Sequence, residues 1–235
     1  MLRTLGTSLC LLLMFAAAAH ATPIRVYAAS ENPGSPYAIL HAPGALANGL
    51  QVMVGSVRFS GDLGVFDGYC VDINHYLTPN RWYTADPPAS MLAWGVADPS
   101  VKTLNSPANA GARAAYLVDT FGNTSDGLQR WALQVAIWNA LYDGDADVTG
   151  GSFWVSSDYA AGLQAANGML AALAGYNGPA LNATWLRLAN DGQGGTQDFT
   201  APVPEPASVL LLGTGLLVLL VRRRAAARLH RQHPS

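Results

Sequence analysis

GLQRWALQVAIWNALY, residues 127–142, is the stretch that most clearly indicates how this chain folds. Its apolar residues recur every three or four positions, which predicts an amphipathic helix. The preceding GNTSD, residues 122–126, supplies a Gly to end one helix and a polar cap to begin the next. We therefore expect a first helix over 110–121. Ser157 is a good N-cap and predicts a third helix from 157 to about 173.

Gln134 is unexpected in the helix predicted over 127–142. On a 3.6-residue wheel it lies near the centre of the apolar face, among Trp131, Ile137, Trp138 and Leu141. A buried carboxamide without hydrogen-bond partners costs on the order of 1–3 kcal/mol. Gln134 is therefore expected either to bond backbone groups in the core or to take part in a reaction that consumes its amide.

The first half of the chain has the residue alternation and β-branched content of strands. The clearest runs are residues 24–27, 50–59, 65–73 and 181–188. The run 65–73 places Cys70 on or beside a strand. With the three predicted helices, these runs predict an α+β fold whose β-rich core comes from about 24–77 and 181–200.

Residues 1–21 have the three parts of a secretory signal peptide: a basic start, an apolar run over 9–18, and a small-x-small sequence at 19–21. Its removal leaves Cys70 as the one thiol of the mature chain, because Cys10 leaves with it. No intrachain disulfide is then expected. A lone exported Cys indicates intermolecular pairing or a thiol committed to other chemistry, and the alternative is a buried Cys that acts as a small apolar residue.

The C-terminal end has a second targeting pattern. Its parts are Pro204, Glu205 and Pro206, an apolar run over 207–221, and a basic tail over 222–235 that begins with Arg222, Arg223 and Arg224. As a helix the run spans roughly 22 Å, which is shorter than the hydrocarbon core but sufficient with snorkelling arginines. Basic residues beside a span stay cytoplasmic, so everything before Pro204 is expected beyond the inner membrane.

This three-part pattern resembles the PEP-CTERM sorting signal of Gram-negative bacteria, here over residues 203–235. The resemblance implies that an exosortase reads the signal and that the inner membrane holds the protein only transiently. Membrane-anchored before cleavage of the tail, the protein is then expected at the cell surface or in the extracellular matrix.

One domain is expected over 22–190, followed by a linker over 191–202. Between residues 22 and 206 there are seven basic and fifteen acidic residues, a formal net charge of −8. This charge disfavours binding to nucleic acid or to an anionic membrane. About 170 residues suffice for a single well-formed core.

Three short motifs follow one another in the predicted domain. They are GYCVD at 68–72, RAAYLV at 113–118 and LQVAIW at 133–138. In this order they resemble the landmarks of the bacterial thioester domain family. The resemblance implies a β-sandwich-like core with an inserted helical part, and an intramolecular thioester in which Cys70 is the thiol and Gln134 the acyl donor.

The chemistry implied by this resemblance is covalent attachment. A thiolate that attacks a glutamine carboxamide expels ammonia and leaves an activated acyl group. An amine-bearing surface or matrix protein would then take the acyl group, so the protein would be an adhesin or cross-linker that reacts once, and not an enzyme. Trp131 and Trp138 are expected to shield the bond from water, and Tyr69 or Asp72 to orient or polarise it. No cofactor is expected.

Other functions remain open at this level. A non-covalent structural or carbohydrate-binding component of the exopolysaccharide matrix would have Cys70 and Gln134 as core residues. His75, five residues after Cys70, allows a cysteine hydrolase, although a surface position at a strand end is the simpler interpretation. The acidic residues 143–147 have the opening spacing of a calcium loop, but Val148 and Trp154 occupy its Gly and Glu positions. A solvated acidic turn is the alternative there, and no metal site is predicted.

Overall fold

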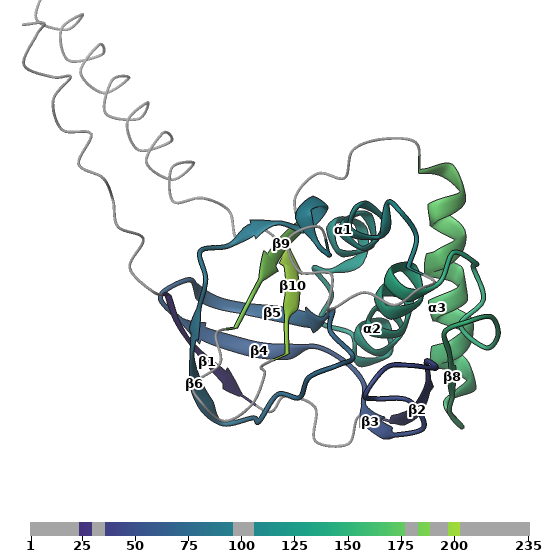
Figure 1. The fold of residues 1–235 in the computed structure, drawn as a ribbon, viewed down its shortest axis with the longest axis horizontal. Coiled ribbons are helices and arrows are strands. Elements are labelled where there is room, and N and C mark those ends of the chain that lie inside the picture. The colour runs from purple at the N-terminus through teal and green to yellow at the C-terminus, as the bar shows by residue number, and fades with distance from the viewer. Residues whose placement is uncertain (1–23, 30–35, 96–105, 177–182, 189–196, 203–235) are drawn as a thin grey trace, which may run out of the picture.

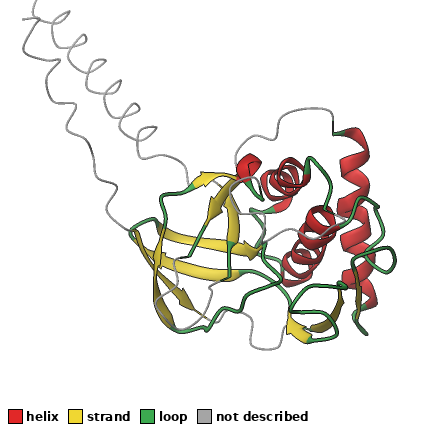
Figure 2. Ribbon diagram, in the orientation of Figure 1, coloured by secondary structure: helices red, strands yellow, loops and turns green. Residues whose placement is uncertain are grey.

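The computed structural model describes residues 24–29, 36–95, 106–176, 183–188 and 197–202. Within these ranges, the larger sheet lies on one side of the molecule and the helices on the other, with a small three-stranded sheet beside the helices (Figures 1 and 2). The α-helices come after most of the strands in the chain and before the last two, so they form an insertion. The predicted mixed fold is confirmed, with a curled antiparallel sheet as its main β part.

The large sheet has seven strands, which pair antiparallel in the order β6, β1, β4, β5, β10, β9, β7. Their bounds are Ile24–Ala29 (β1), Val57–Gly61 (β4), Gly64–Cys70 (β5), Arg81–Ala85 (β6), Ala89–Ser90 (β7), Ala183–Leu186 (β9) and Phe199–Pro202 (β10). A bridge between Ala85 and Leu188 joins strands from the two halves of the sheet, so the sheet curls on itself. Inside it, Phe59 packs against Phe199 with ring centroids 4.9 Å apart.

The predicted strand over 50–59 is two strands. Its first part is β3 (Gln51–Met53), which belongs to a small sheet with β2 (Tyr37–His41) and β8 (Trp154–Ser156), and its second part begins β4. Gly55 lies between them at a φ of 137°, which residues with a side chain rarely adopt. The chain therefore changes sheets at a glycine.

Helix α2 (Gly127–Tyr142) is the centre of the helical layer. It packs between α1 (Ala110–Phe121) and α3 (Ala160–Ala172) and also contacts β5. Asp126 caps its first turn by accepting a backbone hydrogen bond of 2.9 Å. Every residue from 131 to 142 is buried, and so α2 carries Gln134 into the middle of the domain. Short 3-10 turns, Met91–Ala93 and Leu173–Gly175, flank the layer.

The third helix begins later than predicted, at Ala160. Ser157 does not cap it; the Ser157 hydroxyl instead accepts from Tyr159 N at 3.2 Å and donates to Tyr37 O at 2.8 Å. The serine therefore connects the approach to α3 with strand β2.

The predicted linker over 191–202 is wrong for its last residues. Phe199–Pro202 forms β10, which lies between β5 and β9 in the large sheet. Phe199 is completely buried. A strand of four residues after a Gly-rich segment is too short to show clear alternation, which explains the error.

Candidate functional site

Cys70 and Gln134 lie against each other at the junction of the sheet and the helices. The Cys70 N–H donates to Gln134 Oε1 at 2.8 Å, and Gln134 Nε2 donates to Cys70 O at 2.8 Å. Both residues are buried. The sulfur and the amide nitrogen of one cysteine are at most about 4 Å apart, so the Cys70 sulfur lies within about 7 Å of the Gln134 carboxamide.

We call these two reciprocal hydrogen bonds between the Cys70 main chain and the Gln134 carboxamide the clamp. The course of the strands explains why the clamp forms. β4 pairs with β5 as far as Val57, which lies opposite Gly68. Two residues further along β5, the N–H and C=O of Cys70 point to the same edge of β5 as those of Gly68, but β4 no longer runs beside that edge. The Gln134 carboxamide takes the place of the missing strand and satisfies both groups. Backbone partners in the core, one of the two explanations expected for Gln134, are thus present.

The Cys70 thiol is protonated and held by the main chain. Its sulfur donates to Asp72 O at 3.1 Å. Burial and the nearby Asp72 carboxylate raise the pKa of Cys70 well above its ordinary value, while the hydrogen bond to Asp72 and the Trp138 indole oppose the increase only in part. Hydrolase cysteines have a lowered pKa. The thiol therefore lacks the ready thiolate of a cysteine hydrolase and needs a base to react.

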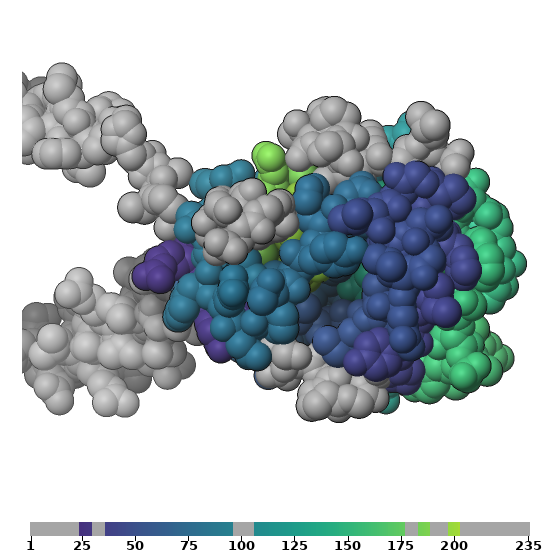
Figure 3. All heavy atoms as spheres, turned by 60° about the horizontal axis from the view of Figure 1, so that its bottom comes forward, coloured from purple at the N-terminus to yellow at the C-terminus, as the bar shows by residue number. Residues whose placement is uncertain are grey.

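A cavity of about 270 Å³ exposes this pair. Its lining includes Cys70, Gln134 and Trp138 on the inner side. Met53 and Tyr76 also line it and are about half exposed. Figure 3 shows a face of the molecule that is hollowed between the blue segments around β3 and the teal segments that follow them in the chain. A small molecule or a side chain can therefore approach the pair from solvent.

Of the two tryptophans predicted to surround the bond, only Trp138 lines the cavity. Its indole lies close enough to the Cys70 sulfur to lower the pKa of that thiol, although the indole N–H makes no hydrogen bond of good geometry within the described residues. Trp131 does not line it: its indole N–H donates to Pro36 O at 2.8 Å and its ring packs on Tyr159. The predicted shielding role of Trp131 therefore has no support in its position.

Tyr69 precedes Cys70 on β5, so its side chain points to the opposite face of the sheet. It is fully buried, and burial raises the pKa of its hydroxyl. The hydroxyl has no partner in the described part of the chain. Tyr69 does not line the cavity, whereas Asp72 reaches the thiol through its main-chain oxygen.

His75 and Gln197 belong to the site although they were not predicted in it. Both line the cavity. His75 Nδ1 pairs with the buried Asp72 carboxylate, and Gln197 Nε2 donates to Asp72 O at 3.1 Å. The side chain of His75 is 35% exposed, so the residue is partly at the surface, as expected, and it lines the cavity as well. The proximity of His75 to Cys70 in the sequence was the available signal; Gln197 had none.

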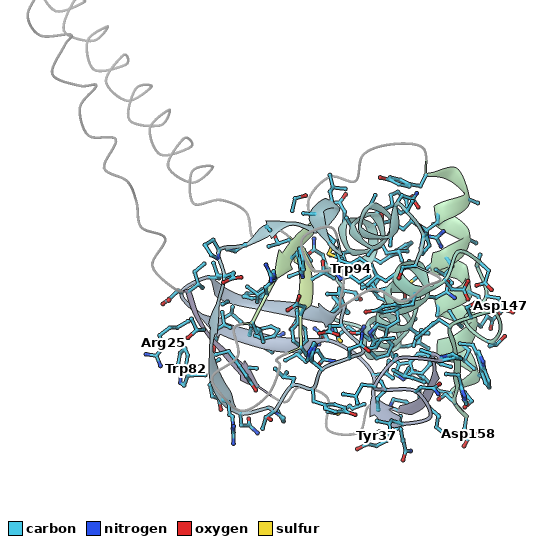
Figure 4. All side chains as sticks on the ribbon, in the orientation of Figure 1. Arg25, Tyr37, Trp82, Trp94, Asp147 and Asp158 are labelled. Carbon is cyan, nitrogen blue, oxygen red and sulfur yellow. The ribbon has the colours of Figure 1, made fainter. Side chains whose placement is uncertain are left out.

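None of the residues in the acidic loop at 143–147 lines this cavity. Asp143 accepts from the backbone of Ser152 and Phe153, and Asp147 from Thr149, so the carboxylates cap their own turn. Figure 4 shows Asp147 beyond α3, at the end of the domain opposite Arg25 and Trp82. Among the described residues, no three His, Cys, Asp or Glu side chains are placed to hold a metal ion. The geometry favours an acidic turn.

Comparisons with known proteins concern the C-terminal sorting motif and the fold. Residues 202–224 match the PEP-CTERM protein-sorting motif. The chain carries a PEP-CTERM sorting motif. This motif implies export, sorting by an exosortase, and a membrane-anchored, surface-sorted protein. The sorting residues 203–235, the signal peptide over 1–21 and the predicted span over 207–221 lie outside the described residues; within those, no helix combines the length and apolarity needed to cross a membrane.

The fold is similar to a solved structure, the N-terminal thioester domain of fibronectin-binding protein SfbI from Streptococcus pyogenes. The alignment has 15% identity and a TM-score of 0.41, and covers 75% of this chain and 98% of the streptococcal chain. A comparison with curated protein sequences finds no match.

Proposed function

We propose that this protein is an exported surface or matrix protein that forms a thioester between Cys70 and Gln134 and uses it for covalent attachment to an amine-bearing partner. The observation that carries the proposal is the reciprocal clamp between the Cys70 main chain and the Gln134 carboxamide. The three ordered motifs that resemble the thioester domain family support the same pair.

The clamp suits acyl transfer. The Cys70 N–H lies 2.8 Å from the carbonyl oxygen on which negative charge develops when sulfur attacks, so it acts as an oxyanion donor. In this step the sulfur–carbon bond forms, the carbon–nitrogen bond of the carboxamide breaks, and the thiol proton leaves with the amide nitrogen as ammonia. Proximity in a close-packed core compensates for the weak reactivity of a carboxamide.

The second step transfers the acyl group to the partner. An amine attacks the thioester carbon, an amide bond to Gln134 forms, and Cys70 is released as a thiol. Because the carboxamide is not regenerated, each molecule reacts once, and the protein is a reagent and not an enzyme. The chain has a single lysine, Lys102, which limits reaction between copies.

Intact mass tests the proposal. The mature wild-type domain should be lighter than its sequence mass by one ammonia, about 17 Da, and methylamine should add about 31 Da to that form while releasing one thiol. Cys70→Ala and Gln134→Ala should both have their full sequence mass and take up no methylamine. A wild-type protein at full mass, with Cys70 alkylated before any amine is added, would leave a non-covalent matrix component as the function.

A further inference from the structure

We propose that His75, held by Asp72, is the proton carrier of the Cys70–Gln134 site. This role rests on the thioester proposed above. In it, His75 takes the thiol proton while the thioester forms and the amine proton while the partner is attached. The observations behind it are the shared cavity of Cys70, Gln134 and His75, and the two contacts of Asp72, one to the thiol and one to the imidazole.

Asp72 positions both reacting groups. Its main-chain oxygen accepts from the Cys70 thiol at 3.1 Å. Its carboxylate, only 2% exposed, accepts from Asn74 N at 2.8 Å and pairs with His75 Nδ1. A carboxylate acceptor places the proton of a neutral imidazole on Nδ1 and leaves Nε2 as the basic nitrogen. The same carboxylate stabilises the imidazolium that forms when Nε2 takes a proton, as in other sites where an acid orients a histidine.

The site needs such a carrier. Burial keeps the Cys70 thiol protonated, and an amide nitrogen leaves readily only after it has gained a proton. Around the cavity, the other titratable groups are poor carriers. Tyr76 is a phenol about half exposed to solvent, the Tyr142 hydroxyl donates to Val71 O at 2.6 Å and burial raises its pKa, and Asp198 accepts from an indole N–H. His75 is the one imidazole among the described lining residues.

The proton balance closes in both steps. During formation, the thiol proton passes to His75 Nε2, sulfur attacks the Gln134 carbonyl carbon, and the imidazolium returns the proton to the amide nitrogen, which leaves as ammonia. During attachment, the proton that the attacking amine loses passes to Nε2 and then to the Cys70 sulfur as the carbon–sulfur bond breaks. His75 ends each step in its starting form, so it is not consumed.

His75→Ala tests this role, because it removes the base and leaves a space next to the cavity that free imidazole can enter. The mature wild-type domain and its variants are compared, and methylamine is the amine probe. The fraction of thioester is measured first by intact mass, and the rate of methylamine addition is then measured with and without imidazole. His41→Ala is the matched control, since His41 stacks on Trp154 in the small sheet and does not line the cavity.

We expect His75→Ala to add methylamine about 100-fold more slowly than wild type. Imidazole should restore its rate in proportion to the imidazole concentration, while wild type and His41→Ala should not respond. If His75→Ala contains no thioester, imidazole should instead induce the loss of ammonia. A misfolded variant would not regain its rate when imidazole is added, so rescue by imidazole separates a lost base from a lost structure. His75→Gln gives a second variant, which should be as slow as His75→Ala.

An unchanged methylamine rate in His75→Ala, or a slow rate or absent thioester that imidazole does not restore, would overturn the role of His75 while the wild-type thioester stands. A wild-type domain without the 17 Da loss would overturn the thioester itself, so the two failures are distinguishable.

Discussion

Removal of the Gln134 side chain should destabilise the domain more than removal of the Cys70 thiol, and by a predictable amount. Cys70→Ala abolishes the thioester but keeps the carboxamide and its two hydrogen bonds to the main chain of residue 70. Gln134→Ala abolishes the thioester and also leaves a buried N–H and a buried C=O without partners, because β4 does not continue past Val57. Each such group costs about 1–3 kcal/mol. The difference in unfolding free energy between the two variants should therefore be about 2–6 kcal/mol.

The cross-link has a separate contribution. It joins residues 64 positions apart, and by analogy with a disulfide the cross-link alone should stabilise the wild type over Cys70→Ala by about 2–4 kcal/mol. Release of Gln134 Nε2 as ammonia removes the donor to Cys70 O and offsets this gain by about 1–3 kcal/mol, so the measured difference should be smaller. Urea unfolding followed by tryptophan fluorescence measures all three proteins, and the double variant closes the cycle. If Gln134→Ala proves no less stable than Cys70→Ala, Gln134 does not satisfy the main chain of Cys70 and the site as described is wrong.

Three further predictions concern other parts of the molecule. Gln134→Ala keeps the buried Cys70 thiol, whose pKa burial raises, so the folded state retains a proton that the unfolded state releases. Its unfolding free energy should fall as the pH rises above the ordinary thiol pKa of 9.0, and the double variant without the thiol should fall less, because only the buried tyrosines, with an ordinary pKa of 10.0, then contribute. Gly122→Ala should destabilise by about 1–3 kcal/mol, because a Cβ there would overlap the Val118 backbone of α1 and approach the Pro202 side chain of β10 too closely. Gly168→Ala in α3 meets open space and should stabilise by about 0.5–1 kcal/mol, and equal thermal shifts for the two variants would contradict the packing at Gly122. Deletion of Arg222 to Arg224 should leave an unprocessed species in the envelope, and extracellular protein that still contains peptides from 210–220 would refute the sorting interpretation.

The helices were predictable because their signals are local. α1 and α2 begin and end where hydrophobic spacing, the Gly at 122 and the Asp cap at 126 place them. Gly122 ends α1 in an ordinary helical conformation, however, and is needed because its Cα lies close to other atoms, which no local pattern reveals. The break at Gly55 was missed, and the residues of β10 were placed in the predicted β-rich core only as far as about 200 and otherwise in a linker, for the same reason: both depend on which sheet the chain joins, and tertiary pairing decides that.

At the site, the sequence indicated the anomalous Gln134 and the lone Cys70, and the family resemblance paired them. The sequence did not reveal the form of the contact, because the clamp depends on β4 ending opposite Gly68, two residues short of Cys70. The importance of His75 depends on the turn after β5, which directs its ring to Asp72 and the cavity. Trp131 was assigned to the site from its helical face, but Tyr159 and Gly162, at the start of α3, cover it. Helical periodicity shows which residues are buried and not which neighbour buries them.

The bond itself is the central claim, and a tryptic digest of the mature domain tests it most directly. Trypsin cuts after Arg58 and Arg81 and after Arg130 and Arg187, so Cys70 and Gln134 fall in the separate peptides 59–81 and 131–187. If the thioester forms, these two peptides appear as one joined species, lighter than their sum by about 17 Da, and methylamine separates them. If instead the two peptides are recovered apart at their full masses from protein never exposed to an amine, with Cys70 free, no thioester exists.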